Sequence, residues 1–286
     1  MLLALLLVAP LAATAQPAPT GWLEALVFDR YAEAAALDEL FPRRFPDPEL
    51  RLRVEAGYRA RLALDASFAF SGHSVDLERE HFDLFVPETQ PESGYGLMVF
   101  IPPGPRVDLP RAWRAVLNST GTILVAPRDA GNGQDTELHR SPLALHAWTN
   151  VTHRYPVDPQ RTYIGGWSGG SRVALRLAVA FPDIFNGAVL IAGSDPVGGP
   201  DGTLLPTDEL LVYLLRSRTR LVLLTGDADE PNVRRDNATL GSLREAGVAG
   251  AETLRVPRLG HRLPGARWML RALGMLEYNA PQSAEE

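Results

Sequence analysis

The stretch TYIGGWSGGSRVALRLAVAFPD, residues 162–183, places four glycines around a single serine, Ser168. An apolar run leads into this cluster and a helix-forming run leads out of it. Because Gly destabilises the interior of a strand or a helix, the cluster predicts a sharp strand-turn-helix. Such a turn lifts the serine Oγ off the sheet edge and aims the amide of Gly169 and the helix N-terminus at one point.

The segment Gly166-Trp167-Ser168-Gly169-Gly170 also satisfies the G-x-S-x-G pattern of a nucleophilic serine. A Gly-rich turn that only packs closely or binds an anion is the alternative.

The regions on both sides of this turn predict an α/β fold. Short apolar runs, each closed by Gly or Pro, indicate buried strands at 97–103, 121–127, 161–167, 187–193 and 220–226. Helical patterns lie at 107–118, 141–154, 169–181, 206–216 and 233–246. Fully apolar strands separated by helices indicate a mostly parallel central sheet that is flanked by helices on both faces. Such sheets hold their sites at the edge formed by the carboxyl ends of the strands. Alternating patterns at 67–72 and 81–88 add an antiparallel pair of strands at one sheet edge.

Helical periodicity near the N-terminus predicts an extension ahead of this domain. Residues 21–41 read as one helix, 41–49 as a Pro-rich linker and 50–64 as a second helix. We therefore expect an N-terminal helical extension over 16–65 and the α/β domain over 66–280.

The first residues predict export. Leu2 to Ala13 are apolar but too few to span a bilayer as a helix. The small-x-small pattern Ala13-Thr14-Ala15 follows, which is typical of a signal-peptide cleavage site. We expect residues 1–15 to be a signal peptide and the mature protein to be secreted or periplasmic. The alternative is an apolar N-terminal helix packed on the domain.

Charge and composition exclude several kinds of partner and site. The formal net charge of −6 gives no reason to expect nucleic acid as a partner. The absence of cysteine excludes disulfides, a thiolate nucleophile and a Cys-ligated metal. No later segment is long and apolar enough to cross a membrane.

A serine hydroxyl is a poor nucleophile unless a base, usually His, takes its proton. The chain has six histidines: His73, His81, His139, His146, His153 and His261. In hydrolases with this motif on a parallel sheet the chain order is Ser, acid, His, and only His261 follows Ser168. His261 also lies in a Gly-His loop between a short predicted strand and a helix. The order and the loop together indicate His261 as the base.

The acid is expected at the end of the preceding strand. The segment LTGDADEPN, residues 224–232, supplies Asp227 and Asp229, and either could orient the imidazole. The Asp-x-Asp spacing also occurs in calcium loops, but Pro231 occupies the next expected ligand position. We therefore expect no metal here.

Three segments resemble the α/β-hydrolase fold: VDPQRTYIGGWSGGSRVALRLAVAFPDIFNGAVLIAG, LTGDADEPN and GHRLPGARWMLRAL. They are most similar to the secreted esterases grouped with polyhydroxybutyrate depolymerases and feruloyl esterases, over residues 80–278. The resemblance implies a cofactor-free serine esterase that cleaves a small or polymeric ester through an acyl-enzyme. It implies Ser168 as nucleophile, Asp229 as acid and His261 as base. Asp229 rather than Asp227 is the acid in this resemblance because members often carry G-x-x-D there, as in Gly226 to Asp229. A serine peptidase and a non-catalytic polymer- or carbohydrate-binding protein on the same scaffold are the alternatives.

The chain departs from this family at the predicted oxyanion loop. Members carry Leu-His-Gly there, and the residue after that Gly donates the second oxyanion amide. Here the segment is Pro102-Pro103-Gly104-Pro105-Arg106, and Pro105 has no N–H. The Gly169 amide is the first expected donor. The second donor is then the amide of Gly104 or Arg106 or a side chain, or the site lacks one. We expect Gly104. The alternative is that this segment is only a rigid surface turn.

Three features are candidates for substrate contact. Trp167 and Trp148 could line an acyl or aromatic pocket, although core packing is the commoner fate of a Trp. The loop PRDAGNGQD, residues 127–135, is expected at the carboxyl edge of the sheet, where it could meet substrate or be only a solvated loop.

Overall fold

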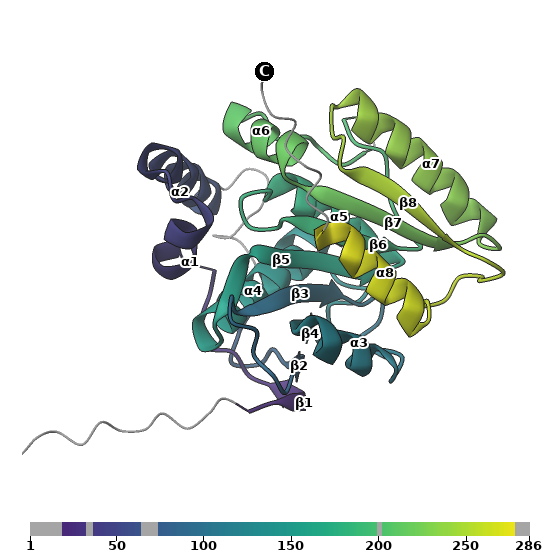
Figure 1. Ribbon diagram of the computed structural model, residues 1–286, viewed down its shortest axis with the longest axis horizontal. Coiled ribbons are helices and arrows are strands. Elements are labelled where there is room, and N and C mark those ends of the chain that lie inside the picture. The colour runs from purple at the N-terminus through teal and green to yellow at the C-terminus, as the bar shows by residue number, and fades with distance from the viewer. Residues whose placement is uncertain (1–18, 33–36, 64–73, 199–201, 278–286) are drawn as a thin grey trace, which may run out of the picture.

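The computed structural model describes residues 19–32, 37–63, 74–198 and 202–277. In this part of the chain, eight strands form one sheet of order β1-β2-β4-β3-β5-β6-β7-β8 (Figure 1). The strands are β1 (Gly21–Leu26), β2 (Phe82–Val86), β3 (Tyr95–Ile101), β4 (Thr122–Pro127), β5 (Val157–Trp167), β6 (Gly187–Ile191), β7 (Arg220–Gly226) and β8 (Ala251–Val256). β2 runs antiparallel to β1 and β4, and all other neighbours are parallel. The predicted mostly parallel sheet is confirmed.

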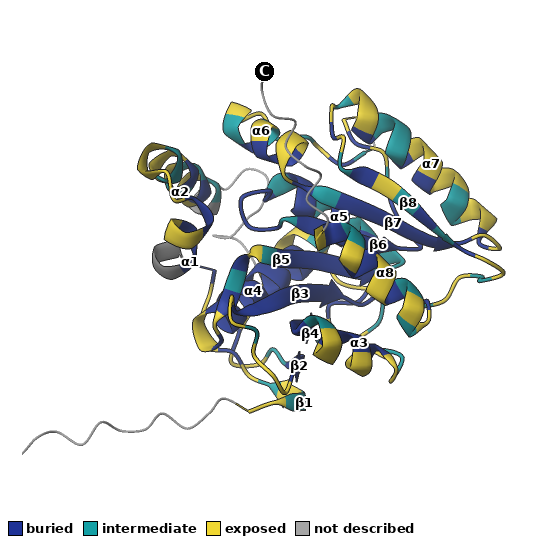
Figure 2. Cartoon of the chain, viewed as in Figure 1, coloured by how far each residue is buried: buried dark blue, intermediate teal, exposed yellow. Residues whose placement is uncertain are grey.

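Helices cover both faces of the sheet, as the apolar strands predict. They are α1 (Leu37–Arg44), α2 (Pro48–Ala63), α3 (Trp113–Thr120), α4 (Ser141–Arg154), α5 (Gly169–Ala180), α6 (Glu209–Ser217), α7 (Glu230–Glu245) and α8 (Ala266–Glu277), with a π-helical turn η2 (Thr136–Arg140) before α4. In Figure 1, α3 and α8 lie in front of the sheet while α4 and α5 lie behind it. Figure 2 shows the central strands buried and the outer faces of α2 and α7 exposed. None of the helices within the described ranges combines the length and the apolar character that a bilayer crossing requires.

The N-terminal segment differs from its prediction. The helix expected over 21–41 is wrong for Gly21–Leu26, which is the edge strand β1 and pairs Trp22 with Phe85 and Leu23 with Leu84. An edge strand is stabilised by its partner more than by its own periodicity, so the local pattern could not reveal it. The later helix begins at Leu37 and continues through the proline at position 42, whereas α2 confirms the second predicted helix.

Two predictions of the N-terminal half lie outside the described residues. These are the signal peptide at 1–15 and the strand at 67–72. The strand predicted within 81–88 is present as β2, and its antiparallel partners are β1 and β4.

Arg44 joins the helical extension to the sheet. Its buried guanidinium donates to the carbonyls of Pro159 at 3.1 Å, Ile184 at 2.6 Å and Pro182 at 2.9 Å. Burial lowers the pKa of this group. The acceptors belong to β5 and to the turn after α5, so one cation holds α1 against the amino end of the sheet.

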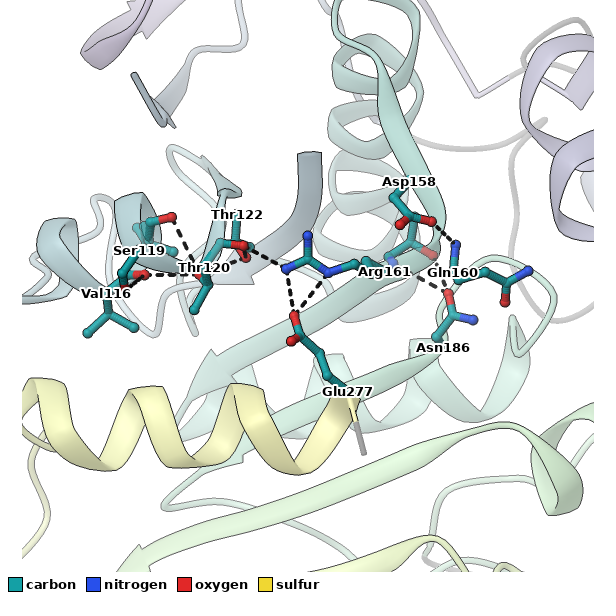
Figure 3. Close-up of polar contacts among 11 residues, drawn as sticks. Val116, Ser119, Thr120, Thr122, Asp158, Gln160, Arg161, Asn186 and Glu277 are labelled. Atoms are coloured by element: carbon teal, nitrogen blue, oxygen red, sulfur yellow. Dashed lines mark hydrogen bonds and ion pairs between the residues drawn. The ribbon is translucent and has the colours of Figure 1, made fainter. Parts of the chain in front are cut away.

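Arg161 connects three elements at the same end of the molecule (Figure 3). Its Nη2 donates to the Thr120 carbonyl at the end of α3 at 2.7 Å, and its Nε donates to Glu277 Oε1 at the end of α8 at 3.0 Å. The contact anchors α8, the helix that follows the His261 loop, far from that loop.

Candidate active site

The turn between β5 and α5 has the sharp geometry that its glycines predict. Ser168 has φ 56° and ψ −120°, a conformation that costs about 1–3 kcal/mol in a residue with a Cβ. A Cβ on Gly170 would lie 2.0 Å from the Ile101 carbonyl oxygen, and one on Gly166 would lie 2.5 Å from the Gly170 oxygen. Only glycine therefore allows strand, turn and helix to approach this closely.

The structure brings Ser168, His261 and Asp229 together from three separate segments. Ser168 Oγ lies 3.0 Å from His261 Nε2, and His261 Nδ1 lies 2.7 Å from Asp229 Oδ2. A carboxylate can only accept, so Nδ1 carries the imidazole proton and Nε2 offers its lone pair to the hydroxyl. The arrangement can deprotonate the serine as it attacks an electrophile.

Asp227 and Asp229 take different places in the loop after β7. Asp229 is 6% exposed and faces the imidazole. Asp227 is exposed and its Oδ1 accepts the backbone N–H of Arg258 at 2.6 Å, in the turn after β8 where Arg258 has φ 57°. Asp227 therefore holds the turn that leads to His261, while Asp229 contacts the ring.

Asn232, in the first turn of α7, is a site residue that the sequence analysis missed. Its Nδ2 donates to Asp229 Oδ2 at 2.8 Å and lies 3.1 Å from His261 Nδ1. Since both Nδ2 and Nδ1 carry hydrogens, they share the Asp229 oxygen rather than bond to each other. In the sequence, Asn232 could have been found only from its spacing, three residues after Asp229 at the start of a helix.

The two tryptophans predicted to contact substrate lie in different parts of the molecule. The Trp167 ring is half-buried, and its centroid lies 5.7 Å from that of the His261 ring, with 34° between the ring planes. Trp148 is fully buried in the core that α4 forms against the sheet. The prediction that Trp148 lines a substrate pocket is therefore wrong, because α4 is buried along almost its whole length.

The predicted oxyanion loop lies beside the serine turn. Gly169 is the first residue of α5, so its N–H has no acceptor within the helix. The Pro103 carbonyl accepts Asn132 N–H at 2.8 Å, and the Pro105 carbonyl accepts Asp129 N–H at 2.7 Å. A Cβ on Gly131 would lie 2.8 Å from the Gly104 carbonyl carbon. The loop 127–135 thus packs directly on the loop that contains Gly104.

Arg140 connects these two loops, and no sequence pattern pointed to it. Its Nε donates to the Ala130 carbonyl at 2.7 Å and its Nη2 to the Pro102 carbonyl at 3.3 Å. The side chain is buried, and burial lowers the pKa of Arg140 to about 10, so the group stays protonated at neutral pH. Within the described ranges, no group of three or more His, Asp or Glu side chains converges as metal ligands.

Comparisons with known proteins agree with this architecture. No family model matches the chain. A poly(3-hydroxybutyrate) depolymerase of Ralstonia pickettii is 26% identical over 98 residues, which cover 29% of this chain and 20% of that protein. The match therefore spans about a fifth of that relative's length.

Similar solved structures include an esterase of Pyrobaculum calidifontis, with a TM-score of 0.50 and 16% identity, covering 69% of this chain and 80% of that one. They also include an S-formylglutathione hydrolase of Staphylococcus aureus, with a TM-score of 0.50 and 15% identity, covering 69% and 92%. A thermophilic carboxylesterase from a metagenomic library has a TM-score of 0.50 and 16% identity, covering 69% and 82%. Likeness at this identity concerns the fold. Together with the strand order and the antiparallel β2, it shows that the chain has the α/β-hydrolase fold that its motifs resemble.

Proposed function

We propose that this protein is a serine hydrolase that cleaves carboxylic esters through an acyl-enzyme. The observation that carries the proposal is the continuous hydrogen-bonded line from Ser168 Oγ through the His261 ring to Asp229. A strained, partly exposed serine next to a correctly oriented imidazole is the arrangement that nucleophilic catalysis requires.

The acylation half-reaction follows from this line. Ser168 Oγ attacks the ester carbonyl carbon while His261 Nε2 takes the hydroxyl proton. The carbonyl oxygen becomes an oxyanion beside the Gly169 N–H, and Asp229 stabilises the charged imidazole through Nδ1. The carbonyl then re-forms, the bond to the alcohol oxygen breaks, and that oxygen leaves with the proton from Nε2.

Deacylation repeats the sequence with water. His261 takes a proton from water, the hydroxide oxygen attacks the acyl carbon, and Ser168 leaves with the proton. The Trp167 ring beside His261 would form one wall for the substrate. An ester, small or polymeric, is favoured because the Ralstonia relative is named as a depolymerase of a polyester.

The test is turnover of p-nitrophenyl esters of short chain length by wild type, Ser168→Ala and a control, Ser119→Ala. Ser119 lies near the end of α3, at the opposite edge of the sheet. Turnover by wild type and Ser119→Ala, with Ser168→Ala reduced by about 10⁴-fold or more, would support the proposal. Covalent labelling by a fluorophosphonate should be lost in the same variant.

Two other outcomes would favour the alternatives. Faster cleavage of peptide amides than of esters would favour a serine peptidase. A wild type with neither turnover nor labelling would favour a non-catalytic binding protein on the same scaffold.

We also propose export as a secreted or periplasmic protein. The support is the sequence pattern of residues 1–15. N-terminal sequencing of the protein recovered outside the cytoplasm should begin at Gln16, and a protein that keeps Met1 in the cytoplasm would contradict the proposal.

A further inference from the structure

The oxyanion side of the candidate site is short of backbone donors. Gly169 offers one N–H, but an oxyanion is usually held by two donors. The neighbouring loop has proline at 102, 103 and 105, and proline at 105 removes the amide that members of the resembled group use. The second donor must therefore be the N–H of Gly104 or Arg106 or a side chain beside the serine turn.

The side chain of Asn132 lies against Gly169, the residue whose N–H is the first donor. A Cβ built on Gly169 would lie 2.1 Å from Asn132 Oδ1, 2.7 Å from its Cγ and 2.9 Å from its Nδ2. The carboxamide thus fills the volume that a side chain at 169 would occupy, directly beside the residue whose amide faces the oxyanion. Asn132 is exposed, and its carboxamide makes no hydrogen bond to any other residue in the described ranges.

The backbone around Asn132 is held firmly, as a preorganised donor requires. Its own N–H donates to the Pro103 carbonyl at 2.8 Å. The preceding residue, Gly131, packs on Gly104 so closely that a Cβ would meet its carbonyl carbon at 2.8 Å. The buried Arg140 binds carbonyls of both loops.

We propose that the Asn132 carboxamide is the second oxyanion donor, in place of the amide that Pro105 lacks. This assignment rests on the proposed esterase function. Both ends of the carboxamide lie within 2.9 Å of the position that a Cβ on Gly169 would take, and rotation about the Cβ–Cγ bond exchanges them. A developing negative oxygen on the Gly169 N–H selects the NH₂ end, because only that end donates. Side-chain amides of this kind serve as oxyanion donors in other serine hydrolases.

The pairing also gives a reason for glycine at 169 beyond the sharp turn. Residue 169 is helical, and any side chain there would displace the carboxamide. Gly169 and Asn132 therefore act as one unit, in which the absence of one side chain makes room for the other.

The experiment compares Asn132→Ala, Asn132→Asp and the loop control Gln134→Ala. The exposed Gln134 side chain belongs to the same loop, and within the described ranges it makes no hydrogen bond to Ser168, Gly169 or His261. For p-nitrophenyl butyrate, kcat of Asn132→Ala should fall about 10²–10³-fold, with KM within about threefold of wild type. Asn132→Asp should lose at least as much, since a carboxylate of the same shape repels the oxyanion. Gln134→Ala should stay within about threefold of wild type.

A second readout separates donation from structural support. An aryl trifluoromethyl ketone forms a hemiketal with the serine and carries the oxyanion itself, so its affinity should fall in proportion to kcat/KM in both Asn132 variants. An Asn132→Ala enzyme with kcat within about threefold of wild type would overturn the assignment and return the role to Gly104 or Arg106. An equal loss in Gln134→Ala, or an unchanged ketone affinity, would overturn it too. These results differ from failure of the proposed function, in which wild type itself would not turn over or Ser168→Ala would remain active.

Discussion

The Asp-x-Asp pair after β7 allows one loop to supply both a test and its control. Asp229→Asn removes the negative charge 2.7 Å from His261 Nδ1 but keeps the shape of the side chain. Asp227→Asn makes the same chemical change two residues earlier, where the carboxylate only accepts the Arg258 N–H. The two variants make the same chemical change, one at the buried carboxylate that faces His261 and one at an exposed carboxylate that does not.

The structure sets the size of the expected loss. An Asn at 229 can present its oxygen to Nδ1 and keep the productive tautomer, or present its NH₂ and force the wrong tautomer, which costs on the order of 10⁴-fold in kcat. Asn232 Nδ2 donates to the same oxygen and so favours the first orientation. The remaining effect is the lost charge of a buried carboxylate beside a partly exposed imidazolium, about 1.5–3 kcal/mol, or roughly 10- to 150-fold. The double variant Asp229→Asn/Asn232→Leu, in which nothing enforces that orientation, should fall further toward 10⁴-fold.

The assay is kcat/KM on p-nitrophenyl butyrate, with thermal unfolding followed in parallel to show that each variant is folded. Asp227→Asn should keep activity within about threefold of wild type. A loss in Asp227→Asn as large as that in Asp229→Asn, or an Asp229→Asn enzyme within about tenfold of wild type, would refute the assignment of Asp229 as the acid.

Three further predictions concern stability. Arg44→Met should lower the free energy of unfolding in urea by about 3–5 kcal/mol, because it leaves several buried carbonyls without a donor; a loss below about 1 kcal/mol would show that α1 is held by its apolar contacts instead. Arg161→Gln should cost only about 1–2 kcal/mol, since the contact with Glu277 is partly exposed, and it should leave kcat unchanged; a large fall in kcat would mean that α8 transmits strain to the His261 loop. Burial lowers the pKa of His139, so the unfolded chain binds a proton there more readily than the folded one, and stability should fall as pH drops through about 6.5. His139→Gln should lose less stability than wild type between about pH 7.5 and pH 5.5 in urea titrations, whereas equal slopes would exclude His139 as the source. Burial raises the pKa of Glu80, which acts with the opposite sign and lies 3.8 Å from His139 Nε2, so both proteins are compared in a Glu80→Gln background.

Much of the fold and part of the site could be predicted because the signals are local. The apolar runs that became β3 to β7 are buried on both faces, so each shows its burial within a few residues. The glycines around Ser168 are needed by contacts within the turn itself, and chain order alone selected His261. Such features do not depend on knowing which distant segment packs beside them.

The features that the sequence did not predict depend on contacts with distant segments of the chain. β1 exists as a strand because β2, some sixty residues later, pairs with it, and nothing in its own pattern separates a helix from an edge strand. Trp148 is buried because α4 packs against the sheet along most of its length, which the helical pattern of 141–154 did not reveal. Asn232 and Arg140 act on atoms that only the folded chain brings near them.

The proline-rich loop after β3 shows both a local sequence signal and a contact with a distant segment. Proline at 105 removes a donor, and from sequence it reads as a defect in the oxyanion site. The same ring fixes φ at its own position, and the carbonyls of Pro103 and Pro105 accept the amides of Asn132 and Asp129. The residues that exclude a backbone donor thus hold in place the loop whose side-chain amide reaches Gly169. A departure from a family pattern at one position is, on this reasoning, a guide to the segment that compensates for it.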